Sequence, residues 1–85
     1  MEERIRIFKA LCDPTRLKIV DFVSEGEKCV CEIVREINRS QSTISQQLAK
    51  LEDLGIFESR REGKSVYYRL SNSKVKRILE VFKEE

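Results

Sequence analysis

Two cysteines separated by one residue are the most reactive groups of this chain. Cys29 and Cys31 lie in the segment Glu-Lys-Cys-Val-Cys-Glu-Ile, and Cys12 is the third cysteine. Soft thiolates prefer As(III), Sb(III), Cd(II), Pb(II) or Zn(II) to hard cations. Residues i and i+2 of a helix point about 200° apart, so Cys29 must precede the first turn if both thiols are to bind one ion. A helix N-terminus also lowers the pKa of a thiol.

The three thiols allow other interpretations. Cys12 falls on the apolar side of a predicted helix, which makes it a core residue first and a metal ligand second. A third thiolate could come from Cys12, from a partner chain or from a small molecule. Cys29 and Cys31 could instead form a redox or reactive-sulfur switch, or have no function. An enzyme is disfavoured, because the chain has no His to act as a base and its cysteines form C-x-C rather than C-x-x-C.

One predicted helix, residues 40–51, has a face suited to the DNA major groove. Ser40 is a good N-cap, and Ile44, Leu48 and Leu51 form one apolar stripe. The other face is polar and small, and residues 37–51 contain no carboxylate. Ser, Thr and Gln can read base edges, while Arg and Lys meet phosphates. The DNA-binding candidates here are Arg39, Ser40, Gln41, Ser42, Thr43, Ser45, Gln46 and Lys50.

The elements around this helix are predicted from periodicity and turn signals. Helices are expected over 2–12, from about 14 to 24 and from 30 to 37, with Asn38-Arg39 linking the third to the fourth. Strands at 56–61 and 66–70 flank a turn at 62–65, and a last helix covers 73–84. This order predicts a mainly α, α+β winged helix-turn-helix over residues 1–85. The wing residues expected to contact DNA are Arg60, Arg61, Lys64 and Tyr67.

Composition is consistent with one small domain. The 85 residues are 40% hydrophobic and 38% charged, with a formal net charge of +2, so the distribution of charge is more informative than its sum. A core this small suggests that a second copy covers part of the surface. No segment is apolar and long enough for a signal peptide or a membrane span, so a cytoplasmic location is expected, with reduced thiols rather than a structural disulfide.

Three segments resemble ArsR-type (ArsR/SmtB) transcriptional repressors. They are Ala10-Leu-Cys-Asp-Pro-Thr-Arg-Leu17, the recognition helix 40–56 and the wing 60–70. The resemblance implies a homodimer paired through residues 2–12 and 73–84, bound to a palindromic operator in double-stranded DNA. Two recognition helices would then lie about 34 Å apart, one DNA turn. The apolar residues expected in the dimer interface are Ile5, Phe8, Ile78, Leu79 and Phe82.

The segment around Cys29 and Cys31 resembles the E-L-C-V-C-D-L motif of the arsenic, antimony, cadmium and lead sensors of that family. Two differences separate it from them. Val34 stands where arsenic sensors often have a further cysteine, and the longer N-terminal arm of the cadmium and lead sensors is not expected here. The family's other zinc site, on the last helix, is excluded because residues 73–85 contain no His.

These observations predict a repressor that needs no cofactor to fold and is released from its operator when a soft metal or metalloid binds the thiolates. A shift at the start of the third helix would change the spacing of the recognition helices, with a coupling of roughly 1–3 kcal/mol. The alternative is the same DNA-binding repressor with a thiol redox or reactive-sulfur switch, or with no small-molecule effector.

Overall fold

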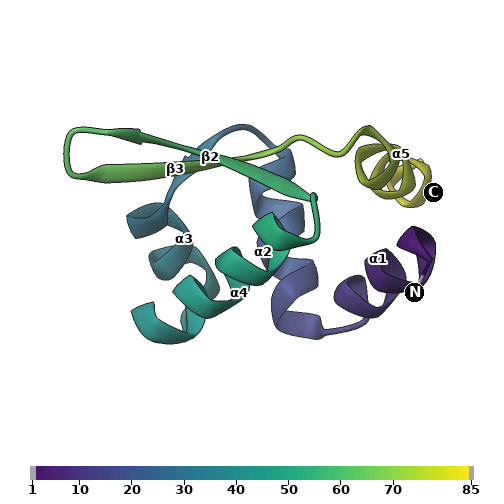
Figure 1. Ribbon diagram of the computed structural model, residues 1–85, viewed down its shortest axis with the longest axis horizontal. Helices are drawn as coiled ribbons and strands as arrows, with labels where there is room; N and C mark the ends of the chain where they lie inside the picture. Colours follow the sequence, from purple (N-terminus) through teal and green to yellow (C-terminus); the bar gives the residue numbers. More distant parts are fainter. Residues whose placement is uncertain (1, 85) are drawn as a thin grey trace.

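The computed structural model describes residues 2–84 and follows the predicted order with one additional strand (Figure 1). Asp13 and Asn72 act as N-caps of the second and last helices, as their residue types predict. The Asp13 carboxylate accepts from the Arg16 backbone N–H at 2.9 Å, and Asn72 Oδ1 accepts from the N–H groups of two residues of the last helix. In chain order the elements are α1 (Glu3–Leu11), α2 (Pro14–Ser24), β1 (Lys28–Cys29), α3 (Val30–Ile37), α4 (Gln41–Asp53), β2 (Phe57–Glu62), β3 (Ser65–Leu70) and α5 (Ser73–Lys83).

Helices α3 and α4 form the predicted helix-turn-helix. Asn38 ends α3 in the left-handed conformation, with φ of 60°, which Asn tolerates better than most residues. Ser40 is the N-cap of α4, and its hydroxyl accepts from the Thr43 backbone N–H at 3.2 Å. The link between the two helices is therefore only three residues long, 38–40, which fixes the direction of α4 relative to α3.

The sheet has three strands in the order β1-β3-β2, all antiparallel. The sequence predicts the hairpin, but each strand extends one residue further toward the turn than expected. The turn therefore consists of only two residues, Gly63, with φ of 60°, and Lys64. The strand β1 is not predicted from the sequence: Lys28 pairs with Tyr68, and Cys29 pairs with Tyr67. A two-residue strand is too short to leave a periodic pattern, so only pairing with β3 defines it.

The core lies between the helices and the inner face of the hairpin. Side chains from α2, α3, α4 and the start of β2 are fully buried and pack together. The predicted stripe of α4 is confirmed, because Ile44, Leu48 and Leu51 are among them. The largest fully buried side chains are Phe57, Ile19, Ile33, Ile44, Leu48, Leu51, Ile56, Val20, Val23 and Val75.

The wing and the first and last helices lie at opposite ends of the molecule (Figure 1). Helices α1 and α5 are adjacent, and the Lys74 ammonium lies 3.0 Å from the Glu3 carboxylate. At the other end, α3 and α4 lie below the hairpin. This arrangement is a winged helix-turn-helix. Among the helices of residues 2–84, none combines the length and the apolar character needed to cross a membrane.

Candidate nucleic-acid interface and thiol site

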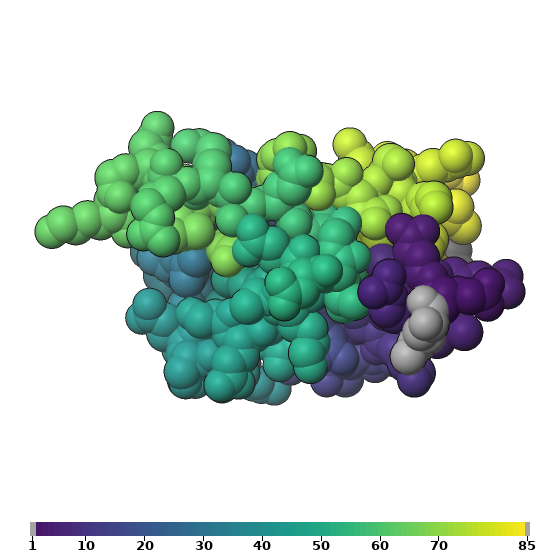
Figure 2. Space-filling model, viewed as in Figure 1, coloured from purple at the N-terminus to yellow at the C-terminus, as the bar shows by residue number. Residues whose placement is uncertain are grey.

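The polar face of α4 is exposed over its length. Gln41, Ser42, Ser45, Gln46 and Lys50 are all exposed, as is Arg39 in the preceding turn. The buried stripe of α4 faces α2 and α3, so the polar side chains must point away from the core. In the space-filling view this teal surface lies beside and below the wing, on one face of the molecule (Figure 2). From Gln41 to Lys50 the structure therefore presents a row of hydrogen-bonding groups without a carboxylate, and the carboxylates of α4, Glu52 and Asp53, lie in its last turn.

Two predicted DNA contacts of α4 are already engaged within the chain. The Ser40 hydroxyl donates to Thr43 Oγ1 at 2.9 Å, and Thr43 is half-buried. Their hydroxyls thus stabilise the first turn of α4. A contact that sequence patterns do not reveal holds the middle of the helix: Arg16 donates to Gln47 Oε1 at 3.1 Å and to the Ala10 carbonyl at 2.9 Å. This arginine fixes α4 against the junction of α1 and α2.

The cations of the wing fall into two groups. Arg61 and Lys64 are exposed, and neither forms an ion pair within residues 2–84. Arg60, which is also expected to contact DNA, does not lie at the tip of the wing: it is two residue pairs away from the turn, opposite Tyr67. Its guanidinium donates to both Glu27 carboxylate oxygens, at 2.9 and 2.8 Å, and lies 4.5 Å from the centre of the Tyr67 ring.

This bidentate pair joins the wing to the segment before β1. The Arg60 guanidinium lowers the pKa of the Glu27 carboxyl, chiefly by hydrogen bonding, and Glu27 in turn raises the pKa of Arg60. Tyr67 is half-buried beneath the guanidinium, so its ring supports Arg60. Sequence reasoning misses Glu27 because the two partners are 33 residues apart and no local pattern connects them.

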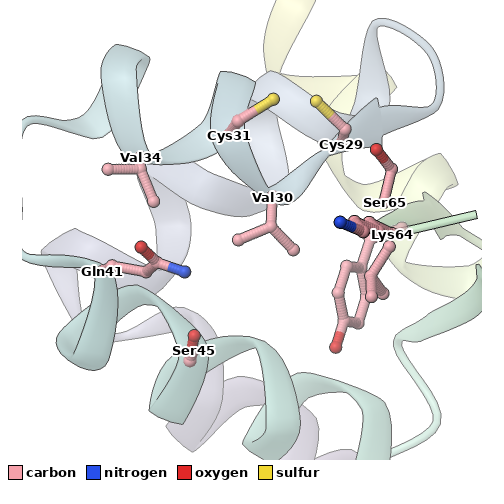
Figure 3. Close-up of a pocket in the computed structure, with 10 residues that line it drawn as sticks. Cys29, Val30, Cys31, Val34, Gln41, Ser45, Lys64 and Ser65 are labelled. Carbon is pink, nitrogen blue, oxygen red and sulfur yellow. The ribbon is translucent and has the colours of Figure 1, made fainter.

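Cys29 and Cys31 are brought together at the start of α3, as two ligands of one ion require. Cys29 is the N-cap of the helix, with φ of −82° and ψ of 159°, so it lies before the first helical turn. The Glu32 carboxylate accepts from the Cys29 backbone N–H at 3.0 Å and holds this geometry. Figure 3 shows the two sulfur atoms turned toward each other.

The environment of Cys29 favours the protonated thiol over the thiolate. The hydrogen bond with the Cys31 thiol raises the pKa of Cys29, and burial raises it further, against a smaller opposing contribution from the Glu32 backbone N–H. The general expectation that a helix N-terminus lowers the pKa of a thiol is therefore wrong for Cys29. Cys29 is buried, whereas Cys31 is exposed. An incoming electrophile or metal ion thus meets Cys31 first.

We expect an alkylating agent to distinguish the two thiols. Limited iodoacetamide treatment at neutral pH should modify Cys31 at least about tenfold faster than Cys29, because Cys29 is buried and its raised pKa keeps it protonated. Peptide mass spectrometry after timed quenching measures both rates. The same peptides from protein treated in denaturant serve as the reference for fully accessible thiols. Equal rates for Cys29 and Cys31 would contradict this assignment.

Cys12 lies apart from the thiol pair. It caps the end of α1 and is exposed, so the prediction that it is a core residue is wrong. It lies in an apolar groove of about 530 Å³ at the α1–α5 end, whereas Cys29 and Cys31 line a different groove beside the wing. Within residues 2–84, no three His, Cys, Asp or Glu side chains are grouped as a metal site. One chain therefore brings two thiols together, not three.

The groove beside the thiols is bounded by three functional elements. It has a volume of about 470 Å³ and lies between the start of α3, the first turns of α4 and the wing tip. Figure 3 shows Gln41 and Ser45 of α4 on one side of it, with Lys64 and Ser65 of the wing near Cys29. The thiol pair thus shares a groove with Gln41, Ser45 and Lys64, which are predicted to contact DNA.

The apolar groove of α1 and α5 contains most of the predicted interface residues. Phe82 is 68% exposed and Phe8 52% exposed, and Ile5 is exposed as well. Leu79 and half-buried Ile78 also line the groove, although Leu79 is largely buried in the core of its own chain. Ile5 is not among the residues that line the groove. Two exposed residues that the prediction omits, Leu17 and Val81, extend the apolar surface.

Comparison with known proteins agrees with this architecture. The model of the bacterial regulatory protein arsR family matches residues 13–59. A cadmium resistance transcriptional regulatory protein CadC homolog from Staphylococcus aureus is 47% identical over 88% of the chain, and the match covers 63% of that protein. The arsenical resistance operon repressor of Escherichia coli is 48% identical over 79% of the chain, and the match covers 58% of the repressor. The chain thus spans about three fifths of the length of each relative.

A solved structure shows the same fold. The homodimeric winged helix-turn-helix DNA-binding domain of Mb0332 from Mycobacterium bovis superposes with a TM-score of 0.86 at 33% identity, covering 95% of this chain and 75% of that one. The fold and the relatives are those of transcriptional regulators rather than enzymes. The chain belongs to the arsR family of bacterial regulatory proteins.

Proposed function

We propose that this protein is a transcriptional repressor that binds a palindromic operator as a homodimer and is released by a soft metal or metalloid at Cys29 and Cys31. The observation that carries the proposal is the exposed face of α4, free of carboxylates from Gln41 to Leu51. It lies beside two wing cations, Arg61 and Lys64, that form no ion pair within residues 2–84, and a thiol pair lines the groove between α4 and the wing. The names of the cadmium and arsenic resistance relatives support the class of effector.

The DNA-binding roles follow from exposure and chemistry. Ser42, Ser45 and Gln46 lie on the outer face of α4, where they would meet base edges in the major groove. Cations around them would hold the phosphates and fix the register. We assign this second role to Arg39, Lys50, Arg61 and Lys64, whereas Arg60 is a positioning residue, because Glu27 and Tyr67 already hold its guanidinium.

The dimer would form through the apolar groove of α1 and α5. This end lies opposite the wing, so pairing there leaves α4 and the wing of each copy free (Figures 1 and 2). Two copies related by a two-fold axis present two recognition helices to successive major grooves, which a palindromic operator matches. The homodimeric state of the related Mycobacterium bovis domain supports this arrangement.

The effector would act on two elements at once. Cys29 is the N-cap of α3, and it also belongs to β1, where it pairs with Tyr67 of the wing. Drawing Cys29 and Cys31 around one ion would therefore displace both the start of α3, which leads into α4, and the strand next to β3. The Glu27–Arg60 pair reinforces the second route, because it joins the same segment to β2.

We expect Glu27→Gln to weaken this coupling. The amide cannot hold the Arg60 guanidinium as an ion pair, so a change at Cys29 should reach the wing less effectively. The ratio of operator Kd values with and without Cd(II) should fall about three- to tenfold, within the usual range of coupling energies. Freed Arg60 should also bind operator slightly more tightly in the metal-free protein. Fluorescence anisotropy of a labelled duplex measures the operator Kd of the wild type and of Glu27→Gln, each with and without Cd(II).

Glu25→Gln is the matched control, because Glu25 is exposed in the same turn and has no ion pair within residues 2–84. It makes the same chemical change without touching Arg60. An unchanged ratio in Glu27→Gln would show that the wing is not coupled to the thiols through this pair.

The DNA-binding assignment is tested with duplexes selected from a random library. Gln46→Ala should weaken binding to the selected site by about 1–3 kcal/mol per half-site and relax the preference at one base position. Lys64→Gln should weaken binding to all duplexes alike and lower the salt dependence by about one counterion per chain. Failure to select any site, or wild-type binding that does not depend on salt, would contradict the proposed function.

A further inference from the structure

The thiol pair is an incomplete site for a trivalent metalloid. As(III) forms three bonds and prefers sulfur, yet the described part of the chain, residues 2–84, groups only two thiols. Cys12 lies in the α1–α5 groove, at the end of the molecule opposite the wing (Figure 1). In a homodimer paired through that end, the Cys12 thiol of the second copy would also lie there, away from Cys29 and Cys31. The described residues therefore supply no third sulfur beside Cys29 and Cys31.

The groove beside the thiols has room for that source. Its volume of about 470 Å³ lies within the roughly 300–1,000 Å³ of typical small-molecule sites. Cys31 is exposed and lines the groove, so an ion bound to it would remain accessible to a further ligand. Figure 3 shows the sulfur atoms at one edge and polar groups of the wing and α4 around the remaining space.

The lining of the groove indicates which molecule fits. Lys64 contributes a cation, and Gln41, Ser45 and Ser65 contribute hydrogen-bonding groups. None of the described residues that line the groove is acidic. Val30 and Val34 offer an apolar wall for a short carbon chain. A small thiol that carries a carboxylate matches this combination, because its sulfur can bind the metalloid while its carboxylate meets Lys64.

We propose that this groove binds a low-molecular-weight carboxylate-bearing monothiol as the third ligand of a metalloid held by Cys29 and Cys31. The inference rests on the proposed effector site. Arsenite, As(OH)₃, would exchange its three hydroxides for three thiolates. Three As–O bonds break, three As–S bonds form, and each departing hydroxide leaves as water with one thiol proton. No atom is oxidised or reduced.

The same groove gives the bound thiol a direct effect on DNA binding. Gln41, Ser45 and Lys64 line the groove and also belong to the surface proposed to face DNA. A ternary complex of protein, arsenic and thiol would therefore occupy space next to the DNA backbone. Its carboxylate would neutralise Lys64, so phosphate binding by the wing tip would weaken in addition to any movement of α3.

The test compares two short monothiols at equal concentration, 3-mercaptopropionate, which carries a carboxylate, and 2-mercaptoethanol, which does not. The reduced protein is titrated with arsenite, followed by ultraviolet thiolate-to-arsenic absorption, and the complexes are weighed by native mass spectrometry. We expect a species with one arsenic and one 3-mercaptopropionate per chain, and an apparent arsenite affinity about fivefold higher than with 2-mercaptoethanol, as one charge-assisted contact supplies. Lys64→Gln should remove that difference, whereas Lys76→Gln, on α5 outside the groove, should retain it.

The outcomes separate this inference from the proposed function. If arsenic bound without a monothiol, and the affinity for arsenite were the same in 3-mercaptopropionate and in 2-mercaptoethanol, the inference would be overturned. The proposed effector site at Cys29 and Cys31 would not be affected by that result. Loss of arsenite binding in Cys12→Ser would also overturn it, since Cys12 would then be the third ligand. No arsenite binding under any condition would overturn the proposed metalloid effector itself.

Discussion

Replacing Cys29 and Cys31 together by serine is expected to lower the affinity for arsenite and Cd(II) by at least about a hundredfold, because both soft ligands of the site are removed. The variant should still bind operator DNA with nearly wild-type affinity. Neither side chain belongs to the outer face of α4, and the backbone hydrogen bond from Cys29 to Glu32 does not involve sulfur. Metal should then no longer release the DNA. Ultraviolet titration and operator anisotropy measure the two properties separately.

Cys12→Ser is the matched control, because it makes the same change in an exposed thiol at the opposite end of the molecule. It should bind metal and release DNA as the wild type does. If the double variant kept a metal response, the effector site would have to lie elsewhere. Should oxidant rather than metal release wild-type DNA, the facing sulfur atoms would act as a redox switch instead.

Phe82→Gln is expected to have the largest effect on assembly. Phe82 is 68% exposed in the single chain and lies in the apolar groove of α1 and α5. A two-fold axis buries this side chain twice, and burying one Phe contributes roughly 1.5–3 kcal/mol, so the dimer should dissociate about a hundredfold more readily or beyond. Sedimentation equilibrium measures the dimer Kd. Operator affinity should fall with it, because one chain contacts only one half-site.

Lys76→Gln controls for a change of side chain on the same helix, since Lys76 is exposed and lies outside the groove. It should leave the dimer intact. Circular dichroism of Phe82→Gln should match that of the wild type, as the substituted side chain is not part of the core. A Phe82→Gln protein that remains fully dimeric at nanomolar concentration would show that the interface lies elsewhere.

Much of the fold could be predicted because its signals are local. The N-caps Asp13, Ser40 and Asn72 begin their helices where residue type and spacing indicate. The period of the apolar residues distinguishes the helices from the hairpin. A small chain with such consistent local preferences leaves few alternative topologies. The paired position of Cys29 and Cys31 also follows from local geometry, since one of them had to precede the helix.

The remaining features depend on contacts between distant segments. β1 exists only because Lys28 and Cys29 pair with β3, and Arg60 is held by a carboxylate far away in the sequence. Cys12 has the phase of a core residue, but α1 ends there and its thiol stays exposed. Helical periodicity identifies a face, whereas the packing of other elements decides whether that face is covered.

The pKa of Cys29 likewise depends on the folded structure and cannot be predicted from a local sequence pattern. A local rule predicts a lowered value at the start of α3. The neighbouring thiol and burial outweigh that contribution, and both depend on the folded arrangement. Because metal binding requires the thiolate, affinity for soft metals should rise with pH as Cys29 loses its proton. At the proposed site an incoming ion would therefore meet Cys31 first and would then have to displace the proton of Cys29.

The central claim is that occupation of the Cys29–Cys31 site controls DNA binding, and one titration tests it most directly. Reduced wild-type protein is bound to its selected, fluorescently labelled operator, and arsenite or Cd(II) is added while anisotropy and ultraviolet thiolate absorption are followed in the same cuvette. The account predicts that DNA is released in parallel with the absorption and is complete near one ion per chain. Saturation of the thiolates while the DNA stays bound would contradict it.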